Sequence, residues 1–157
     1  MSQTATINPR IIEALYCEAL VLADEVRASF ALSGRIGQAG AEEDLARVAL
    51  SCEALRTTTR MMHAVAWLLN HRAYLMGELS EFQLRRQGRL SADASRSDPE
   101  QVSLLDAPTR ELIAATERFH ARLLRLDSGW REGVHQRVPT GAAIARLRER
   151  MSFHVAN

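Results

Sequence analysis

The side chains best suited to chemistry in this 157-residue chain include five histidines, and their spacing does not favour a shared site. His63 and His71 are eight residues apart, which turns them roughly 80° away from each other on a helix. Glu117 and His120 have the i, i+3 spacing of a di-iron bundle, but such a site needs that pair twice and two further glutamates. Phosphate-binding glycine motifs and paired C-x-x-C motifs do not occur. We therefore expect no catalytic residue, no metal ligand and no cofactor, and hence no enzyme.

Arginines are the other candidates, because all 20 basic residues are arginine and the net charge is only +1. Pairs one helical turn apart could hold phosphates, although this spacing is more typical of solvated faces that pair with acids. Aromatic residues that stack on bases do not lie between them, so nucleic-acid binding is unlikely and remains only an alternative. The pairs are Arg56 with Arg60, Arg118 with Arg122, and Arg146 with Arg150.

One long predicted helix, residues 45–76, must position most of these side chains. It carries a seam of apolar or small residues at alternating spacings of three and four, the a/d pattern of a heptad. The seam is expected to be buried, so that Leu69→Ala would cost roughly 2–5 kcal/mol through the cavity it leaves. A second stripe lies about 110° around the helix. Because each stripe must be covered to leave water, we expect two flanking helices and a second subunit, with residues 61–76 near the homodimer interface. The seam comprises Leu45, Val48, Cys52, Leu55, Thr59, Met62, Ala66, Leu69, Ala73 and Met76; the second stripe comprises Ala54, Thr58, Met61, Val65, Leu68, Leu75 and Leu79.

Capping signals predict the remaining helices. Asn8 and Pro9 begin a first helix, Gly77 is expected to end the long helix, and the S-x-x-Q pattern at Ser80 predicts a short helix to about Gln87. Residues 88–103 are polar and predict a mobile loop. A third helix is expected to begin after Asp106 and to end at residues 127–129. The first and third helices each carry one stripe at a spacing of three or four residues, Ile12, Leu15, Ala19, Leu22, Val26 and Phe30 in the first and Leu112, Thr116, Phe119, Leu123 and Leu126 in the third. The fold predicted is all-α: an antiparallel three-helix bundle with a long central helix and a short extra helix over residues 1–130, followed by a partly ordered C-terminal tail, 131–157.

Composition favours a globular protein of the cytoplasm. Hydrophobic residues make up 46% of the chain and charged residues 25%. Cys17 and Cys52 lack metal-type spacing and are interpreted as buried, reduced thiols. The N-terminus lacks the apolar segment of a secretory signal, and the longest apolar run, residues 64–69, is too short to cross a membrane.

Two groups of residues are candidates for contact with a protein partner. Trp67 and Tyr74 are seven residues apart and lie outside both stripes, so they belong either to the buried packing or to a partner contact. The second group lies in the C-terminal tail, which would dock as an induced helix on an acidic, grooved partner or pack as a fourth helix. Its members are Arg146, Leu147, Arg150 and Met151.

The run ALRTTTRMMHAVAWLLNHRAYLMGELS and the later run RELIAATERFHARLLRLD resemble the two blocks of the alphaproteobacterial DUF1465 family, typified by the regulator of CtrA degradation. The resemblance covers roughly residues 10–128. It implies a dimeric three-helix adaptor that works with companion adaptors to bring CtrA and other protein clients to the ATP-dependent protease ClpXP. It implies no catalytic or ligand residues. The alternatives are a nucleic-acid-associated helical regulator and a structural dimeric bundle with another partner.

Overall fold

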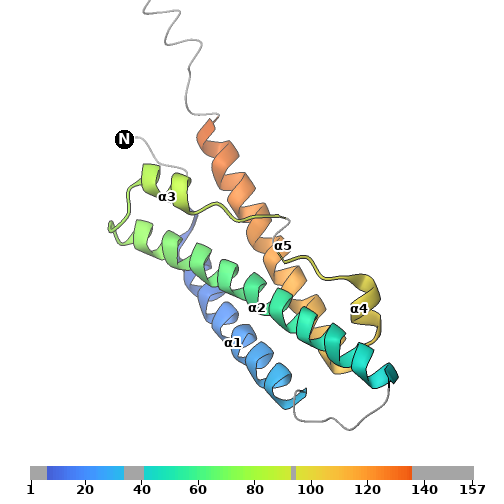
Figure 1. Ribbon diagram of the computed structural model, residues 1–157. Helices are drawn as coiled ribbons and strands as arrows, with labels where there is room; N and C mark the ends of the chain where they lie inside the picture. The colour runs from blue at the N-terminus through green and yellow to red at the C-terminus, as the bar shows by residue number, and fades with distance from the viewer. Residues whose placement is uncertain (1–6, 34–40, 93–94, 136–157) are drawn as a thin grey trace, which may run out of the picture. The chain divides into compact units, whose positions relative to one another are not determined.

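The computed structural model describes residues 7–33, 41–92 and 95–135, and every regular element within them is a helix (Figure 1). The all-α prediction is therefore confirmed for this part of the chain. The helices are α1 (Pro9–Ser33), α2 (Ala41–Leu75), α3 (Glu81–Gln87), α4 (Pro99–Ser103) and α5 (Ala107–His135).

These residues belong to two compact units. Ile7–Asp127 forms one unit and contains α1 to α4 and most of α5. Residues 128–135, the last part of α5, belong to the other. The contacts described below are those within Ile7–Asp127.

Helices α1 and α2 are the most closely packed pair and run in opposite directions. Near one end, the Arg72 guanidinium on α2 donates a 2.6 Å hydrogen bond to the Glu13 carboxylate on α1. Near the other end, Phe30 of α1 packs against the cluster that contains Ala49 of α2. The short connection between the two helices gives this antiparallel arrangement, as expected.

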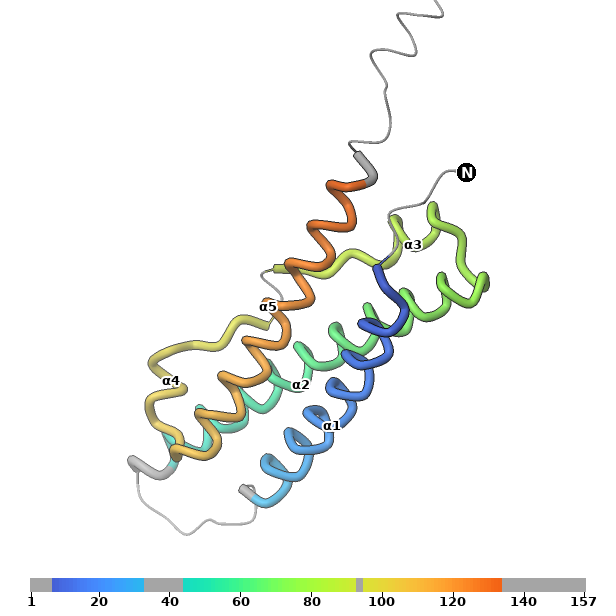
Figure 2. Tube along the Cα trace, turned by 180° about the vertical axis from the view of Figure 1, so that it is seen from behind, coloured from blue at the N-terminus to red at the C-terminus, as the bar shows by residue number. Residues whose placement is uncertain are grey.

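Helix α5 runs in the same direction as α2, which differs from the predicted alternation of directions (Figures 1 and 2). Arg60 of α2 is hydrogen-bonded to Thr116 of α5. Further along both helices in the same direction, Trp67 is hydrogen-bonded to Asp127. The physical reason is the connection of residues 76–106, which contains α3 and α4 and returns along α2 to its starting end. Helix α5 therefore begins beside the start of α2 and is antiparallel only to α1.

The predicted caps begin and end these helices. The Asn8 side chain accepts a 2.9 Å bond from the backbone N–H of Arg10, and Ser80 forms a capping box with Gln83. Gly77 ends α2 with φ +79°, a conformation that glycine adopts without a Cβ clash. The predicted end of α5 at residues 127–129 is wrong, since the helix continues to His135. Glycine within a helix costs only about 1 kcal/mol relative to alanine, too little to stop it.

The core confirms the predicted stripes of α1 and α5. The buried residues of α1 follow a helical period, and those of α5 lie on one face. On α2 the buried apolar residues belong partly to the second predicted stripe. The main cluster comprises Ile12, Leu15, Ala19, Val26, Met61, Ala64, Trp67, Leu68, Leu90, Phe119 and Leu123.

The ten-residue heptad seam of α2 was predicted to face the core, and this prediction is wrong. Leu55 is 68% exposed and Met62 is 65% exposed, and the seam faces away from the other helices. The inward face instead carries Glu53, Thr57 and Arg60, whose polar groups a hydrophobicity pattern assigns to solvent. We call the ten seam residues the outer seam.

Two neighbouring leucines test this register. Leu68 is fully buried, so Leu68→Ala should lower the free energy of unfolding by about 2–5 kcal/mol through the cavity it leaves. Leu69 belongs to the outer seam and is 43% exposed, so Leu69→Ala should change the stability of the monomer by no more than about 0.5 kcal/mol. Urea unfolding at low protein concentration measures both. Equal losses of unfolding free energy in the two variants would mean that the seam faces the core, as predicted.

Candidate functional site

A layer of buried polar side chains lies in the middle of α2 and α5. Glu53, Thr57 and Thr116 are fully buried, and Arg60 is 2% exposed. We call these four residues the polar layer. Buried charges are costly unless they are paired and hydrogen-bonded, so the partners of Arg60 and Glu53 show what the layer holds in place.

Arg60 joins α5 to the connection that precedes it. Its Nη1 donates a 2.6 Å bond to Thr116 Oγ1, and its Nη2 donates to the Ser95 carbonyl at 2.7 Å and to Ser97 Oγ at 2.8 Å. Burial lowers the pKa of the Arg60 guanidinium, whereas the charges of Glu117 and Glu53 raise it. The guanidinium is therefore a structural cation that fixes three segments together.

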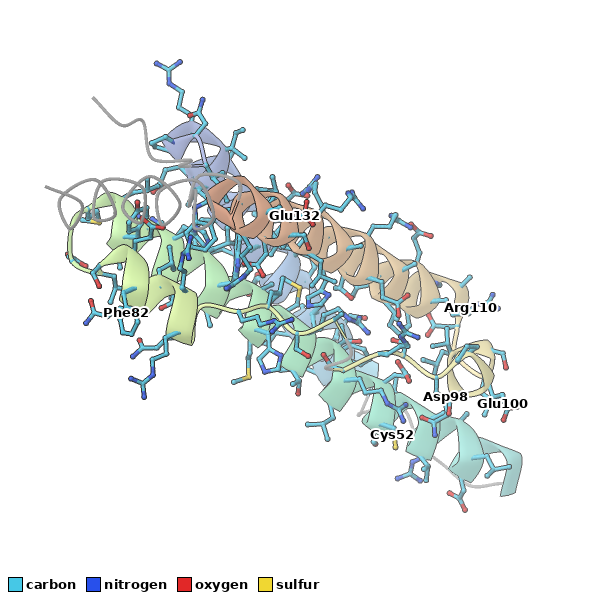
Figure 3. All side chains as sticks on the ribbon, turned by 90° about the horizontal axis from the view of Figure 1, so that it is seen from above. Cys52, Phe82, Asp98, Glu100, Arg110 and Glu132 are labelled. Atoms are coloured by element: carbon cyan, nitrogen blue, oxygen red, sulfur yellow. The ribbon has the colours of Figure 1, made fainter. Side chains whose placement is uncertain are left out.

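Glu53 holds the start of α4 in the same way. Its Oε1 accepts a 3.0 Å bond from the backbone N–H of Asp98 and a 2.5 Å bond from Arg56. Arg56 also donates to the Gln101 side chain on α4 at 2.6 Å. In Figure 3, Asp98 and Glu100 mark the start of α4 beside α2.

The prediction of a mobile loop over residues 88–103 is therefore wrong for the residues described there, 88–92 and 95–103. Leu90 is buried in the main core, and Pro99–Ser103 is helical with Asp98 as its cap. Sequence reasoning missed this because the residues that fix the segment, Glu53 and Arg60, lie about 40 positions earlier in the chain.

Removing the guanidinium should release this segment. We expect Arg60→Leu to increase the rate of trypsin cleavage after Arg96 at least about tenfold, because the bonds to Ser95 and Ser97 are lost. Arg27→Leu is the matched control, since Arg27 pairs with Asp24 on the exposed surface of α1. Mass spectrometry of timed digests measures the cleavage. Unchanged cleavage after Arg96 in Arg60→Leu would contradict the assigned role.

His120 lies next to the polar layer and is 6% exposed. Its Nε2 has no hydrogen-bond partner among the described residues. Burial lowers the pKa of the imidazole, and the nearby charges of Arg60 and His63 lower it further. The environment therefore favours the neutral imidazole, which fits a histidine that is part of the packing and not a metal ligand.

This lowered pKa predicts a loss of stability in acid. The unfolded chain binds a proton at His120 near the ordinary pKa of about 6.5, before the folded chain does. The stabilisation is thus present above about pH 6.5 and is lost as the pH falls through the folded pKa. We expect His120→Gln to flatten the fall in melting temperature between about pH 7 and pH 5. His63→Gln, at an exposed site, should flatten it less; equal slopes in all three proteins would refute the assignment.

Trp67, predicted as a partner contact or a packing residue, belongs to the packing. It is 2% exposed, its indole N–H donates a 3.0 Å bond to Asp127, and its ring lies 4.0 Å from that of His71. Its assignment as a partner-binding residue is therefore wrong in this structure, because the aromatic surface is already covered. Tyr74 is half-buried and stays a candidate. Residues 146–151, with the other four candidates, lie outside the described residues.

The arginine pairs divide into anchors and ion pairs. Arg56 and Arg60 turn towards Glu53 and the polar layer, so they do not form the solvated face that was the more typical interpretation. Arg118 pairs with Glu111, and Arg122 pairs with Glu18 across α5 and α1, as that interpretation requires. Arg146 and Arg150 lie outside the described residues.

Two surfaces within the described part of Ile7–Asp127 are candidates for contact with a partner. A groove of about 810 Å³ is lined by residues of α1 and α5, among them the apolar Val21, Leu22 and Phe119 and the Arg122–Glu18 ion pair. The outer seam of α2 is the second, and Cys52, half-exposed, marks it in Figure 3. Cys17 is exposed in the groove, so neither thiol is buried as predicted.

Comparison with known protein families identifies the family of this chain. The sequence model of a family described as proteins of unknown function, DUF1465, matches residues 3–153. The chain belongs to the DUF1465 family. Curated proteins and solved structures give no match. Within the described part of this DUF1465 protein, His, Cys, Asp and Glu side chains form no group of three that could hold a metal ion. None of the helices in these same residues is both long and apolar enough to span a bilayer.

Proposed function

We propose that this DUF1465 protein is a non-enzymatic adaptor that helps deliver cell-cycle regulatory substrates such as CtrA to the ClpXP protease in the cytoplasm. Family membership supports the proposal, together with the resemblance of residues 54–80 and 110–127 to the family of the regulator of CtrA degradation. An adaptor acts through contact surfaces and does not need convergent catalytic groups. Its clients, companion adaptors and protease would be proteins.

The observation that carries the proposal is the outer seam. It places large apolar side chains in water along the whole length of α2. Contiguous exposed apolar surface of this kind is typical of protein–protein contact sites. Residues 61–76, the expected dimer region, make up the second half of this seam. We therefore assign the outer seam to a homodimer contact.

Client contacts are assigned to the remaining surfaces. The α1/α5 groove is lined by apolar side chains, a feature that suits the apolar face of an amphipathic helix. The tail residues Arg146, Leu147, Arg150 and Met151 stay proposed contacts for a client or a companion adaptor. The groove assignment places a client away from the dimer contact.

The alternatives have less support. A nucleic-acid-associated regulator would need free cationic side chains on one face, but Arg118, Arg122 and Arg72 each pair with a glutamate. A purely structural dimer would use the outer seam equally well and would leave the groove and tail without a role.

Client delivery tests the proposal directly. Purified ClpXP should degrade purified CtrA several-fold faster in the presence of this protein and its companion adaptors. A chain truncated after residue 135 should lose most of this effect, because the proposed tail contacts are absent, while its melting temperature stays within about 2 °C of the full chain. Degradation followed by gel densitometry measures the first quantity and circular dichroism the second.

The controls separate the parts of the proposal. No acceleration by the full chain would refute the adaptor role for this client. Equal acceleration by the truncated chain would refute the role of the tail alone. A large fall in melting temperature would mean that the tail packs as a fourth helix of the bundle.

A further inference from the structure

We infer that two copies of this chain pair through their outer seams as antiparallel helices, with the two-fold axis crossing α2 between Arg60 and Met61. The inference rests on the homodimer of the proposed function and adds its geometry. It starts from the heptad pattern of the exposed face, which the core of the subunit does not use.

The seam is self-complementary when one copy is reversed. In antiparallel coiled coils, an a residue of one helix faces a d residue of the other. Here the a positions are 45, 52, 59, 66 and 73, and the d positions are 48, 55, 62, 69 and 76. One register pairs all ten positions. It places Leu45 opposite Met76 of the second copy, Val48 opposite Ala73, Cys52 opposite Leu69, Leu55 opposite Ala66 and Thr59 opposite Met62.

Side-chain volumes favour this register over a parallel one. In four of the five layers, a large residue faces a small one, as in Leu55 against Ala66. A parallel pair would place Leu55 against Leu55 and Ala66 against Ala66, so that wide and narrow layers alternate along the seam. Close packing favours a nearly constant volume per layer, and the antiparallel register approaches it in four of the five layers.

Electrostatics favour the same direction. The two α2 dipoles oppose each other in an antiparallel pair and are aligned unfavourably in a parallel one. Asp44, exposed near the first turn of α2, would lie towards the end of the second helix that carries Arg72. In a parallel pair the two Asp44 carboxylates would approach each other. Charged residues are absent from all ten seam positions.

The contact is long enough for a specific interface. The seam spans 32 residues, or about 48 Å of helix, and a helix is about 10–12 Å wide. These dimensions give roughly 500 Å² in projection on each copy, which reaches the total of about 1,000 Å² expected of a specific interface. The second copy is therefore a sufficient occupant of the whole seam.

Cysteine cross-linking tests the register, because Cys52 is already in the seam. We start from Cys17→Ala, which removes the exposed groove thiol, and add Leu69→Cys at a half-exposed position. The antiparallel register places Cys52 of one copy beside position 69 of the other. A short bismaleimide should therefore convert most of the C17A/L69C protein to covalent dimer, and peptide mapping should find the 52–69 link.

Two control proteins exclude the parallel pair. C17A, with Cys52 alone, and C17A/C52A/L69C, with position 69 alone, should both stay uncross-linked. Positions 52 and 69 are 17 residues apart, so identical thiols would lie about 25 Å from each other in the antiparallel pair. Efficient 52–52 or 69–69 links would overturn the inference in favour of a parallel pair. A 52–69 link within one chain is excluded by the same distance.

Light scattering separates this inference from the proposed function. The wild-type chain should be a dimer, and Met62→Glu should weaken dimerisation at least about tenfold, because it places two carboxylates near the axis. Val21→Glu, at a 63% exposed site in the α1/α5 groove, should leave it unchanged. A dimer that resists Met62→Glu, or lacks the 52–69 link, keeps the proposed homodimer and overturns the antiparallel seam. A wild-type monomer at tens of micromolar overturns both.

Discussion

The arrangement of Ile7–Asp127 depends on the burial of one guanidinium. Arg60 needs several hydrogen-bond partners to be buried. Burying an unpaired charge costs more free energy than most single contacts in a domain contribute. Its partners are a threonine on α5 and two groups of the segment that precedes α4. Glu53, about two turns earlier, fixes the other side of that segment. These bonds hold the connection along α2, and the connection determines that α5 starts at the same end as α2.

This constraint explains which parts of the fold followed from the sequence. Local signals were sufficient for the Asn8 cap, the Ser80–Gln83 capping box and the Gly77 stop, because each acts within a few residues. The stripes of α1 and α5 were also correct, since each of these helices has one apolar face. The direction of α5 was wrong because it depends on bonds between residues about 40 to 60 positions apart.

Helix α2 shows what the spacing of apolar residues cannot predict. Spacing identifies which residues share a face, and the seam does lie on one face as predicted. It does not identify which face turns inward when the inner face contains Glu53, Thr57 and Arg60 and the outer face contains leucine and methionine. The hydrogen bonds that Arg60 and one carboxylate oxygen of Glu53 make inside the subunit reverse the usual assignment. The candidate residues were affected in the same way: Trp67 is covered, whereas Met62 and Leu69, assigned to the core, are open to a partner.

The outward orientation of the α2 seam also separates the two surfaces assigned to partners. Residues of the outer seam come from α2 and from Met76 directly after it, whereas the described groove is lined by α1 and α5 alone. Because the seam turns away from the helices that form the groove, a second copy bound to the seam leaves the groove uncovered. Two copies related by an axis through the middle of α2 would present two such grooves, which raises the effective concentration of a second site for a client with two binding segments. Dimerisation and client binding would then support each other without sharing a side chain.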